Sequence, residues 1–144
     1  MITFLGGPSP IMCGDCGGLT PLYRFAPVCA DSHYTLYNWI WSYKAADQLD
    51  ICSGALEADA EKQLTSHYSS LNAAGREFAR KFETDSGKPF YYHLLRTESG
   101  NERSPDMEAC PSCSRPWRLP EAWHGFEFKC EPCRLVAYSV ASDE

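Results

Sequence analysis

Four cysteines near the C-terminus form two Cys-x-x-Cys pairs. Cys110-Pro-Ser-Cys113 and Cys130-Glu-Pro-Cys133 are separated by sixteen residues, a spacing typical of four-cysteine zinc sites. Each pair can turn two thiolates to one side of a tight turn, and four sulfurs at ~2.3 Å complete a tetrahedron around zinc. We therefore predict one structural zinc ion at these residues, with no coordination position open for catalysis.

Free or redox-active thiols are the alternative interpretation, but two such pairs at this spacing seldom occur without a metal. Short β-prone segments at 117–119, 124–129 and 135–140 accompany the pairs, and together they predict a zinc ribbon. About thirty residues are too few for an independent apolar core. Metal ligation, roughly 10–16 kcal/mol in zinc-finger peptides, should therefore supply most of the ribbon's stability.

A third pair, Cys13-Gly-Asp-Cys16, lies near the N-terminus and is followed by Cys29 and His33. These four residues could hold a second metal, because Cys29 and His33 are spaced like the later ligands of a mixed site. The other interpretation is packed thiols, which we favour because cysteines are common in helical cores. A thioredoxin-like redox role is less favoured, since no βαβ pattern surrounds the pair.

The elements that would position these residues begin with a helix over 33–48, after Asp31 as its N-cap. Its apolar stripe consists of Leu36, Trp39, Ile40 and Tyr43. The preceding segment, 21–29, has two prolines and no helical period, so we expect it to be extended or rich in turns.

Two more helices and a strand are expected before residue 97. Ser53 is a good cap for the second helix, and Ser69 or Ser70 opens the third, which Gly87 ends. The second helix would bury Leu56, Ala60 and Leu64. The third would bury Leu71, Ala74, Phe78 and Phe82. The aromatic run at 90–96 predicts the strand.

The predicted class is α+β: a small helical domain of about three helices and a strand, with a C-terminal four-cysteine zinc ribbon. Residues 1–97 form the helical domain with the N-terminal Cys-x-x-Cys segment, 98–109 a polar linker, and 110–144 the ribbon. No apolar run approaches the ~20 residues of a membrane span, and the start lacks the features of a signal peptide. We expect a cytoplasmic protein with reduced thiols.

The net charge of -6 is concentrated in the middle of the chain, where twelve acids and seven bases give residues 46–109 a charge of -5. Residues 110–144 sum to -1 before the thiolates are counted. Nucleic-acid binding is thus disfavoured, although ribbon residues could contact bases or phosphates. The candidates are Trp117, Phe126 and Phe128 for stacking, and Arg115, Arg118, Lys129 and Arg134 for phosphates.

The same charge favours a basic protein partner, which would dock on acidic helical faces. The candidate residues are Glu57, Asp59, Glu61, Glu77, Glu83 and Asp85, whose alternative role is an ordinary solvated surface. An enzyme is not expected, because the four histidines, His33, His67, His93 and His124, lie in no recognised catalytic motif.

The sequence also resembles a bacterial family of zinc-ribbon-containing proteins labelled DUF2310, over roughly residues 12–140. Cys13-Gly-Asp-Cys16 with Pro21-Leu-Tyr-Arg24 is similar to the opening motif, and Trp39 with Ala46-Asp-Gln-Leu49 to the first helix. The later motifs of the family follow in the same order along the chain. They are Gly75-Arg76, Gly87-Lys-Pro-Phe-Tyr-Tyr92, the closing Cys-Pro-Ser-Cys, Trp117-Arg-Leu119 and Phe126-Glu-Phe-Lys-Cys-Glu-Pro-Cys-Arg-Leu-Val136.

This resemblance implies a zinc ribbon and suggests nucleic-acid binding. Position 114 departs from the pattern, being Ser where a knuckle glycine is usual, and the family's extra N-terminal sequence is missing. Cys13-x-x-Cys16-Gly17 and the later pair also resemble double-CxxCG proteins that act as immunity partners of bacterial toxins. The combined expectation is a non-enzymatic zinc-ribbon protein that binds a basic protein, such as a toxin, with a nucleic-acid-binding regulator as the alternative.

Overall fold

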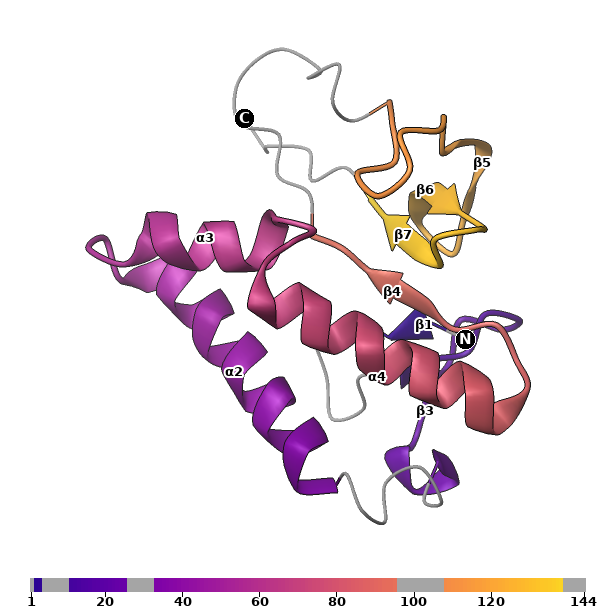
Figure 1. The fold of residues 1–144 in the computed structure, drawn as a ribbon, viewed down its shortest axis with the longest axis horizontal. Coiled ribbons are helices and arrows are strands. Elements are labelled where there is room, and N and C mark those ends of the chain that lie inside the picture. The colour runs from indigo at the N-terminus through magenta and orange to yellow at the C-terminus, as the bar shows by residue number, and fades with distance from the viewer. Residues whose placement is uncertain (1, 4–10, 26–32, 96–107, 139–144) are drawn as a thin grey trace.

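The computed structural model describes residues 2–3, 11–25, 33–95 and 108–138 (Figure 1). The helices are the 3₁₀ helix η1 (Leu22–Phe25), α2 (His33–Cys52), α3 (Glu57–Thr65) and α4 (Ser70–Ser86). The strands are β1 (Ile2–Thr3), β2 (Ile11–Met12), β3 (Leu19–Thr20), β4 (Tyr91–His93), β5 (Arg118–Trp123), β6 (Phe126–Cys130) and β7 (Leu135–Ala137). The mixed α+β class is confirmed.

One seven-stranded sheet joins the two halves of the chain, in the order β3-β2-β1-β4-β7-β6-β5. Strand β4 is parallel to both β1 and β7, and the other pairs are antiparallel. The three ribbon strands therefore continue the sheet that begins at the N-terminus. Strands β1–β3 were not predicted, and most of the expected linker, 98–107, lies outside the described residues, so the predicted domain division stays a prediction.

Helix α2 begins where predicted and runs four residues further than 48, to Cys52. All four residues of its predicted apolar stripe are buried. Trp39 also donates its Nε1–H to the Leu71 carbonyl at 2.9 Å, which ties α2 to the start of α4. No helix among residues 33–95 and the other described segments is long and apolar enough to cross a bilayer.

The predicted caps of the third helix are confirmed, but the predicted cap of the second is wrong, because Leu56 and not Ser53 is the N-cap of α3. Ser53 Oγ accepts from the Leu56 N–H at 2.8 Å, but Leu56 itself is exposed, so its predicted place on the buried face is wrong. The helix begins one residue after Leu56, which leaves that side chain outside the packed turns. Ser69 caps α4 through the Asn72 N–H, and Gly87, at φ 64°, ends it.

The helices pack against β4 through a buried polar centre. Asn72, fully buried, donates to the carbonyls of Leu64 and Ser66 and accepts from the Tyr92 hydroxyl at 2.8 Å. Gly75 lies where α4 crosses β4: a Cβ there would come within 2.6 Å of Trp39 and 2.8 Å of Tyr92 Cζ. This contact fixes α4 beside the strand that carries the ribbon (Figure 1).

Candidate metal centre

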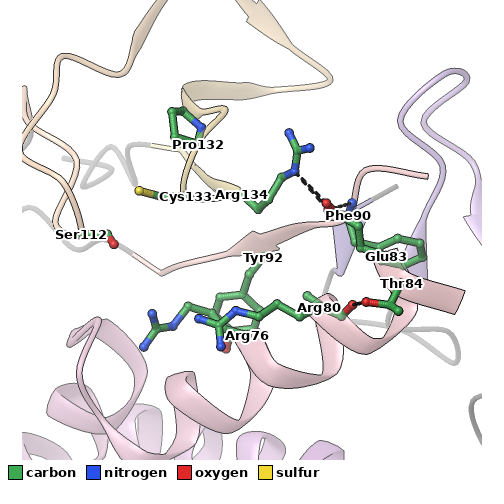
Figure 2. Close-up of a pocket in the computed structure, with 11 residues that line it drawn as sticks. Arg76, Arg80, Glu83, Thr84, Phe90, Tyr92, Ser112, Pro132, Cys133 and Arg134 are labelled. Atoms are coloured by element: carbon green, nitrogen blue, oxygen red, sulfur yellow. Dashed lines mark hydrogen bonds and ion pairs between the residues drawn. The ribbon is translucent and has the colours of Figure 1, made fainter. Parts of the chain in front are cut away.

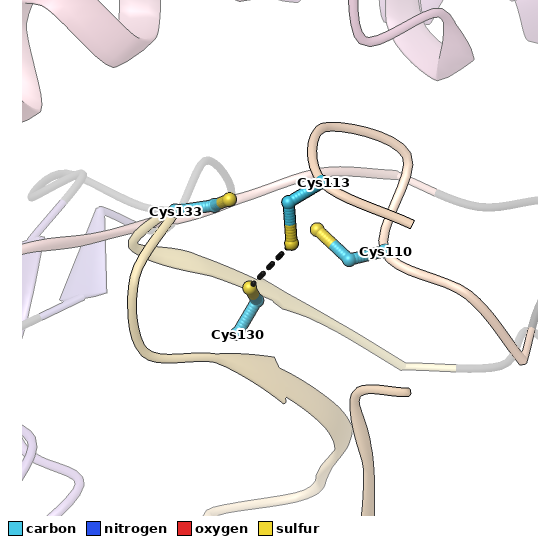
Figure 3. Close-up of side chains that lie close together, drawn as sticks. All are labelled: Cys110, Cys113, Cys130 and Cys133. Atoms are coloured by element: carbon cyan, nitrogen blue, oxygen red, sulfur yellow. Dashed lines mark hydrogen bonds between the residues drawn. The ribbon is translucent and has the colours of Figure 1, made fainter. Parts of the chain in front are cut away.

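The four cysteines predicted as zinc ligands come together at one edge of the ribbon (Figure 3). Their sulfurs all lie within 4.8 Å of one another, and the Sγ atoms of Cys113 and Cys130 are 3.7 Å apart. A tetrahedron with ~2.3 Å zinc–sulfur bonds has edges of about 3.8 Å, so this spacing suits a metal and is far longer than a disulfide. The grouping of the four cysteines is confirmed, and the four sulfurs could hold a metal ion such as zinc.

Two backbone hydrogen bonds form the turn of the first knuckle. The Cys110 N–H donates to the Arg115 carbonyl and the Ser114 N–H donates to the Cys110 carbonyl, both at 2.8 Å. The residue after each second cysteine has a left-handed conformation, with φ 58° at Ser114 and 53° at Arg134. Ser114 thus adopts the glycine-type backbone that the knuckle requires, so its departure from glycine does not prevent the turn.

The thiols differ in how readily they ionise. Burial raises the pKa of the Cys110 and Cys130 thiols. The Arg115 N–H lowers the pKa of Cys113 to about 7. Two of the sulfurs are therefore disfavoured as thiolates in the absence of a cation, and a divalent ion would offset the charge of all four.

Strands β5 and β6 form a hairpin behind the cluster, turned by His124 and Gly125 at positive φ. The ring centroids of Trp117 and Phe128 are 5.3 Å apart, and Phe126 packs near Tyr138. Trp117, Phe126 and Phe128 are each at most 3% exposed. Because they are buried, these three rings are not available as stacking platforms for bases.

Three of the four basic residues proposed for phosphates already have intramolecular partners. Arg118 pairs with Glu108 at 3.2 Å, and Arg134 pairs with Glu83 at 3.0 Å. Lys129 pairs with Glu131 and lies 4.1 Å from the centre of the Trp123 ring. These contacts reduce the charge that the ribbon can offer to a phosphate backbone.

The six acidic candidates do not form one surface. Glu57 and Asp59 are exposed on α3 and Glu61 is half-buried there, whereas Glu77 pairs with Lys81 on α4. Glu83 accepts from the Phe90 N–H and from Arg134, and the Phe90 N–H is the main reason that its pKa is lowered. Asp85 is exposed at the end of α4 away from α3 (Figure 1).

An acidic cluster does form where α2 and α3 meet, and two of its members were not predicted. Asp50, at the end of α2, lies close enough to Asp47, Glu57 and Glu61 to interact electrostatically with each of them. Burial, followed by repulsion from Glu61, Glu57 and Asp47, raises the pKa of Asp50. The charge sum of the middle segment was the available signal, but only the helical hairpin places these four acids together.

The histidines and the N-terminal cysteines occupy separate places. His67 and His93 are buried, and burial lowers the pKa of His93 to about 4. His124, in the β5–β6 turn, contacts the Gly14 carbonyl beside Cys13 and Cys16. Cys29 and the His33 side chain, the other members of the predicted second site, lie outside the described residues.

A groove of about 490 Å³ separates α4 from the second knuckle (Figure 2). Its charged lining comprises Arg76, Arg80, Glu83 and Arg134. Arg76 contacts His67 at 2.8 Å, and burial and the nearby Arg80 lower its pKa. The sequence did not indicate this excess of arginine, because Arg76 and Arg80 belong to the middle segment, whose net charge is negative.

Two family models match different parts of the chain. A model described as a domain of unknown function, DUF2310, matches residues 1–95, and a second such domain, DUF8594, matches residues 100–142. The ribbon, which the resemblance assigned to DUF2310, is thus matched by the second model. No solved structure matches.

Two proteins of Haemophilus influenzae, each described as an uncharacterized protein, are 34% identical over 136 residues, or 94% of this chain. The alignments cover 52% of one relative and 67% of the other, so the chain spans about half to two thirds of their lengths. The DUF2310 model matches well over half of this chain, so the chain belongs to the DUF2310 family.

Proposed function

We propose that this protein is a non-catalytic binding module, stabilised by one structural zinc ion, that binds a basic protein through the surface formed by α2 and α3. The observation that carries the proposal is an apolar face of α2 exposed beside the acidic cluster. The four-cysteine cluster supports the zinc part, because four protein ligands leave no open position for a substrate or an activated water.

The exposed side of α2 carries large apolar residues that the fold does not use. Trp41 is 68% exposed and Ile51 is 69% exposed, and Tyr37 lies one turn before Trp41. Tryptophan and tyrosine dominate the energetics of many protein interfaces, because they bury large areas at small entropic cost. An exposed series of this kind on one helix is a plausible anchor for a partner.

The acids beside this face define the chemistry of the partner. Asp47, Asp50, Glu57 and Glu61 give it a negative potential, and the repulsion among them would be relieved by a cationic group. A partner with basic residues around an apolar anchor fits both features. A cationic toxin domain, of the kind bound by immunity proteins, is one such partner.

Affinity purification from the native bacterium tests this function. Tagged wild type should retain one basic protein, in a complex that weakens as salt rises. Trp41→Ala should reduce retention at least tenfold, and the triple change of Glu57, Asp59 and Glu61 to Lys should slow association. Tyr23→Ala is a matched control, because Tyr23 is equally exposed but lies on η1, away from α3 (Figure 1).

A nucleic-acid-binding regulator is the second candidate, and the arginine-lined groove is the observation that favours it. Arg80 lies in the groove without an ion pair to any residue that the structure describes. If wild type shifts RNA or DNA in a gel at physiological salt with submicromolar affinity, and Arg80→Glu abolishes the shift while Trp41→Ala does not, this alternative replaces the protein-binding proposal.

A further inference from the structure

We propose that Cys13 and Cys16 are thiolate ligands of a second metal ion of the zinc class, separate from the ribbon site. The loop that holds them has the backbone of a metal knuckle. Its flanking strands β2 and β3 pair antiparallel through Ile11 with Thr20 and Met12 with Leu19, which holds the two ends of the loop together.

The backbone of residues 13–18 repeats that of residues 110–115. The Cys13 N–H donates to the Gly18 carbonyl at 2.7 Å, as the Cys110 N–H does to Arg115 at 2.8 Å. The Gly17 N–H donates to the Cys13 carbonyl at 2.9 Å, as the Ser114 N–H does to Cys110 at 2.8 Å. Both loops then pass through a left-handed residue, with φ 70° at Gly17 and 58° at Ser114.

The first sulfur of each loop also faces the same backbone donors. The N–H groups of Cys16 and Asp15 donate hydrogen bonds to the Cys13 sulfur. In the ribbon, the N–H groups at the same relative positions, Ser112 and Cys113, donate to the Cys110 sulfur. Backbone N–H groups directed at a sulfur stabilise its thiolate, which is the form that binds metal.

Exposure separates this pair from core thiols. Cys16 is exposed and Cys13 is half-buried, so packing, the interpretation favoured from the sequence, does not describe Cys16. The sulfurs of Cys13 and Cys16 supply half of a tetrahedral site. The sequence offers Cys29 and His33 for the other half, and a second copy of the chain could supply its own Cys13 and Cys16 instead.

The ribbon is docked on this loop through His124. Its Nε2 lies 2.6 Å from the Gly14 carbonyl, and since a carbonyl only accepts, Nε2 carries the proton. A Cβ on Gly17 would lie 3.2 Å from His124 Nδ1, so the absence of a side chain there permits the close approach. Metal bound at Cys13 and Cys16 would therefore also stiffen the contact between the N-terminal hairpin and the ribbon.

Counting metal on the full chain tests the proposal. Protein loaded with zinc under reducing conditions should carry two ions per monomer, or three per dimer if a second copy completes the site, by native mass spectrometry. Cys13→Ser and Cys16→Ser should each remove the N-terminal ion and leave the ribbon ion. Cys52→Ser is the matched control, because Cys52 is equally exposed but lies at the end of α2, and it should change nothing.

Two further measurements identify the ligands and guard against misfolded variants. Loss of the second ion in Cys29→Ser or His33→Ala places the remaining ligands on the same chain, whereas a metal-dependent dimer places them on a second copy; both support the proposal. In wild type, zinc should protect Cys13 and Cys16 from alkylation as it protects Cys110. A single ion per chain, alkylation of Cys13 and Cys16 in the presence of zinc, or a Cys13–Cys16 disulfide in freshly isolated protein would overturn it.

Discussion

One apolar core extends from helices α2–α4, around Trp39, Leu64 and Phe82, into the ribbon, whereas the four sulfurs that could hold a metal ion all belong to the ribbon. Both regions share one sheet through β4 and β7. Apolar burial can hold the helices, whereas the ribbon, with about thirty residues, is expected to depend also on a bound metal ion. The contrast teaches that one cooperative sheet can have two sources of stability, which different changes should affect separately.

The largest effect is expected from removing a metal ligand. Cys110→Ser should abolish tight zinc binding at the ribbon site and unfold residues 110–138, because the proposed zinc ion is expected to supply most of the ribbon's stability. The helices should remain, with lower stability because β4 loses β7. Circular dichroism would show whether the helices remain folded. Loss of the dispersed NMR resonances of Trp117 and Phe128 would show that the ribbon has unfolded. An ordered ribbon in a strong chelator would contradict the comparison.

Gly75→Ala should affect the other region. The new Cβ would meet Trp39 and Tyr92 at distances that real Cβ atoms do not adopt, so α4 must shift from β4. We expect a loss of about 2–3 kcal/mol in the free energy of unfolding, with the zinc content of the ribbon unchanged. The control is Ala73→Gly on the exposed side of α4, which should cost about 1 kcal/mol. Equal effects of the two changes would mean that this packing is unimportant.

The link between the two regions should be sensitive to pH. Glu83 on α4 binds the Phe90 N–H and Arg134 of the second knuckle, and its pKa is lowered in the folded protein. Its stabilisation is therefore present above the unfolded pKa of about 4.3 and is lost as pH falls through the lower folded pKa.

Glu83→Gln should thus reduce stability at neutral pH by about 1 kcal/mol or less, because the pair is about a third exposed. The difference from wild type should shrink in acid, as urea titrations at several pH values would show. Glu77→Gln is the control, since Glu77 pairs with the exposed Lys81 of the same helix. A difference that grows in acid would contradict the assigned role.

The parts of the structure that the sequence predicted are those encoded by nearby residues. Cys110 and Cys113 need only a turn, and Ser69 and Gly87 cap a helix through local hydrogen bonds. The two ribbon pairs are farther apart, but their fixed spacing carries the information. This is why the helices, the caps of α4 and the four-cysteine cluster could be predicted.

The parts that could not be predicted depend on distant partners. Strands β1–β3 have two residues each, too few for an alternating pattern, and exist because β1 pairs with β4. The docking of His124 on Gly14 joins residues 110 positions apart. The acidic cluster and the arginine-lined groove likewise require the helix arrangement, since net charge along a segment does not give its distribution in space.

The smallest expected effect comes from a change that should stabilise the ribbon and leave the helices unaffected. Ser114 has φ 58°, a conformation that costs a residue with a Cβ roughly 1–2 kcal/mol, whereas the N-terminal loop has Gly17 at the matching position. Ser114→Gly removes that cost but raises the entropy of the unfolded chain, so the net gain should be up to about 1 kcal/mol. Competition with a chelator should show correspondingly tighter zinc binding, by about fivefold at most.

Ser112→Gly is the matched control: Ser112 lies in the same knuckle without a positive φ, so glycine there should weaken binding or leave it unchanged. Equal gains from both changes would show that loop flexibility, and not the left-handed conformation of residue 114, limits the site.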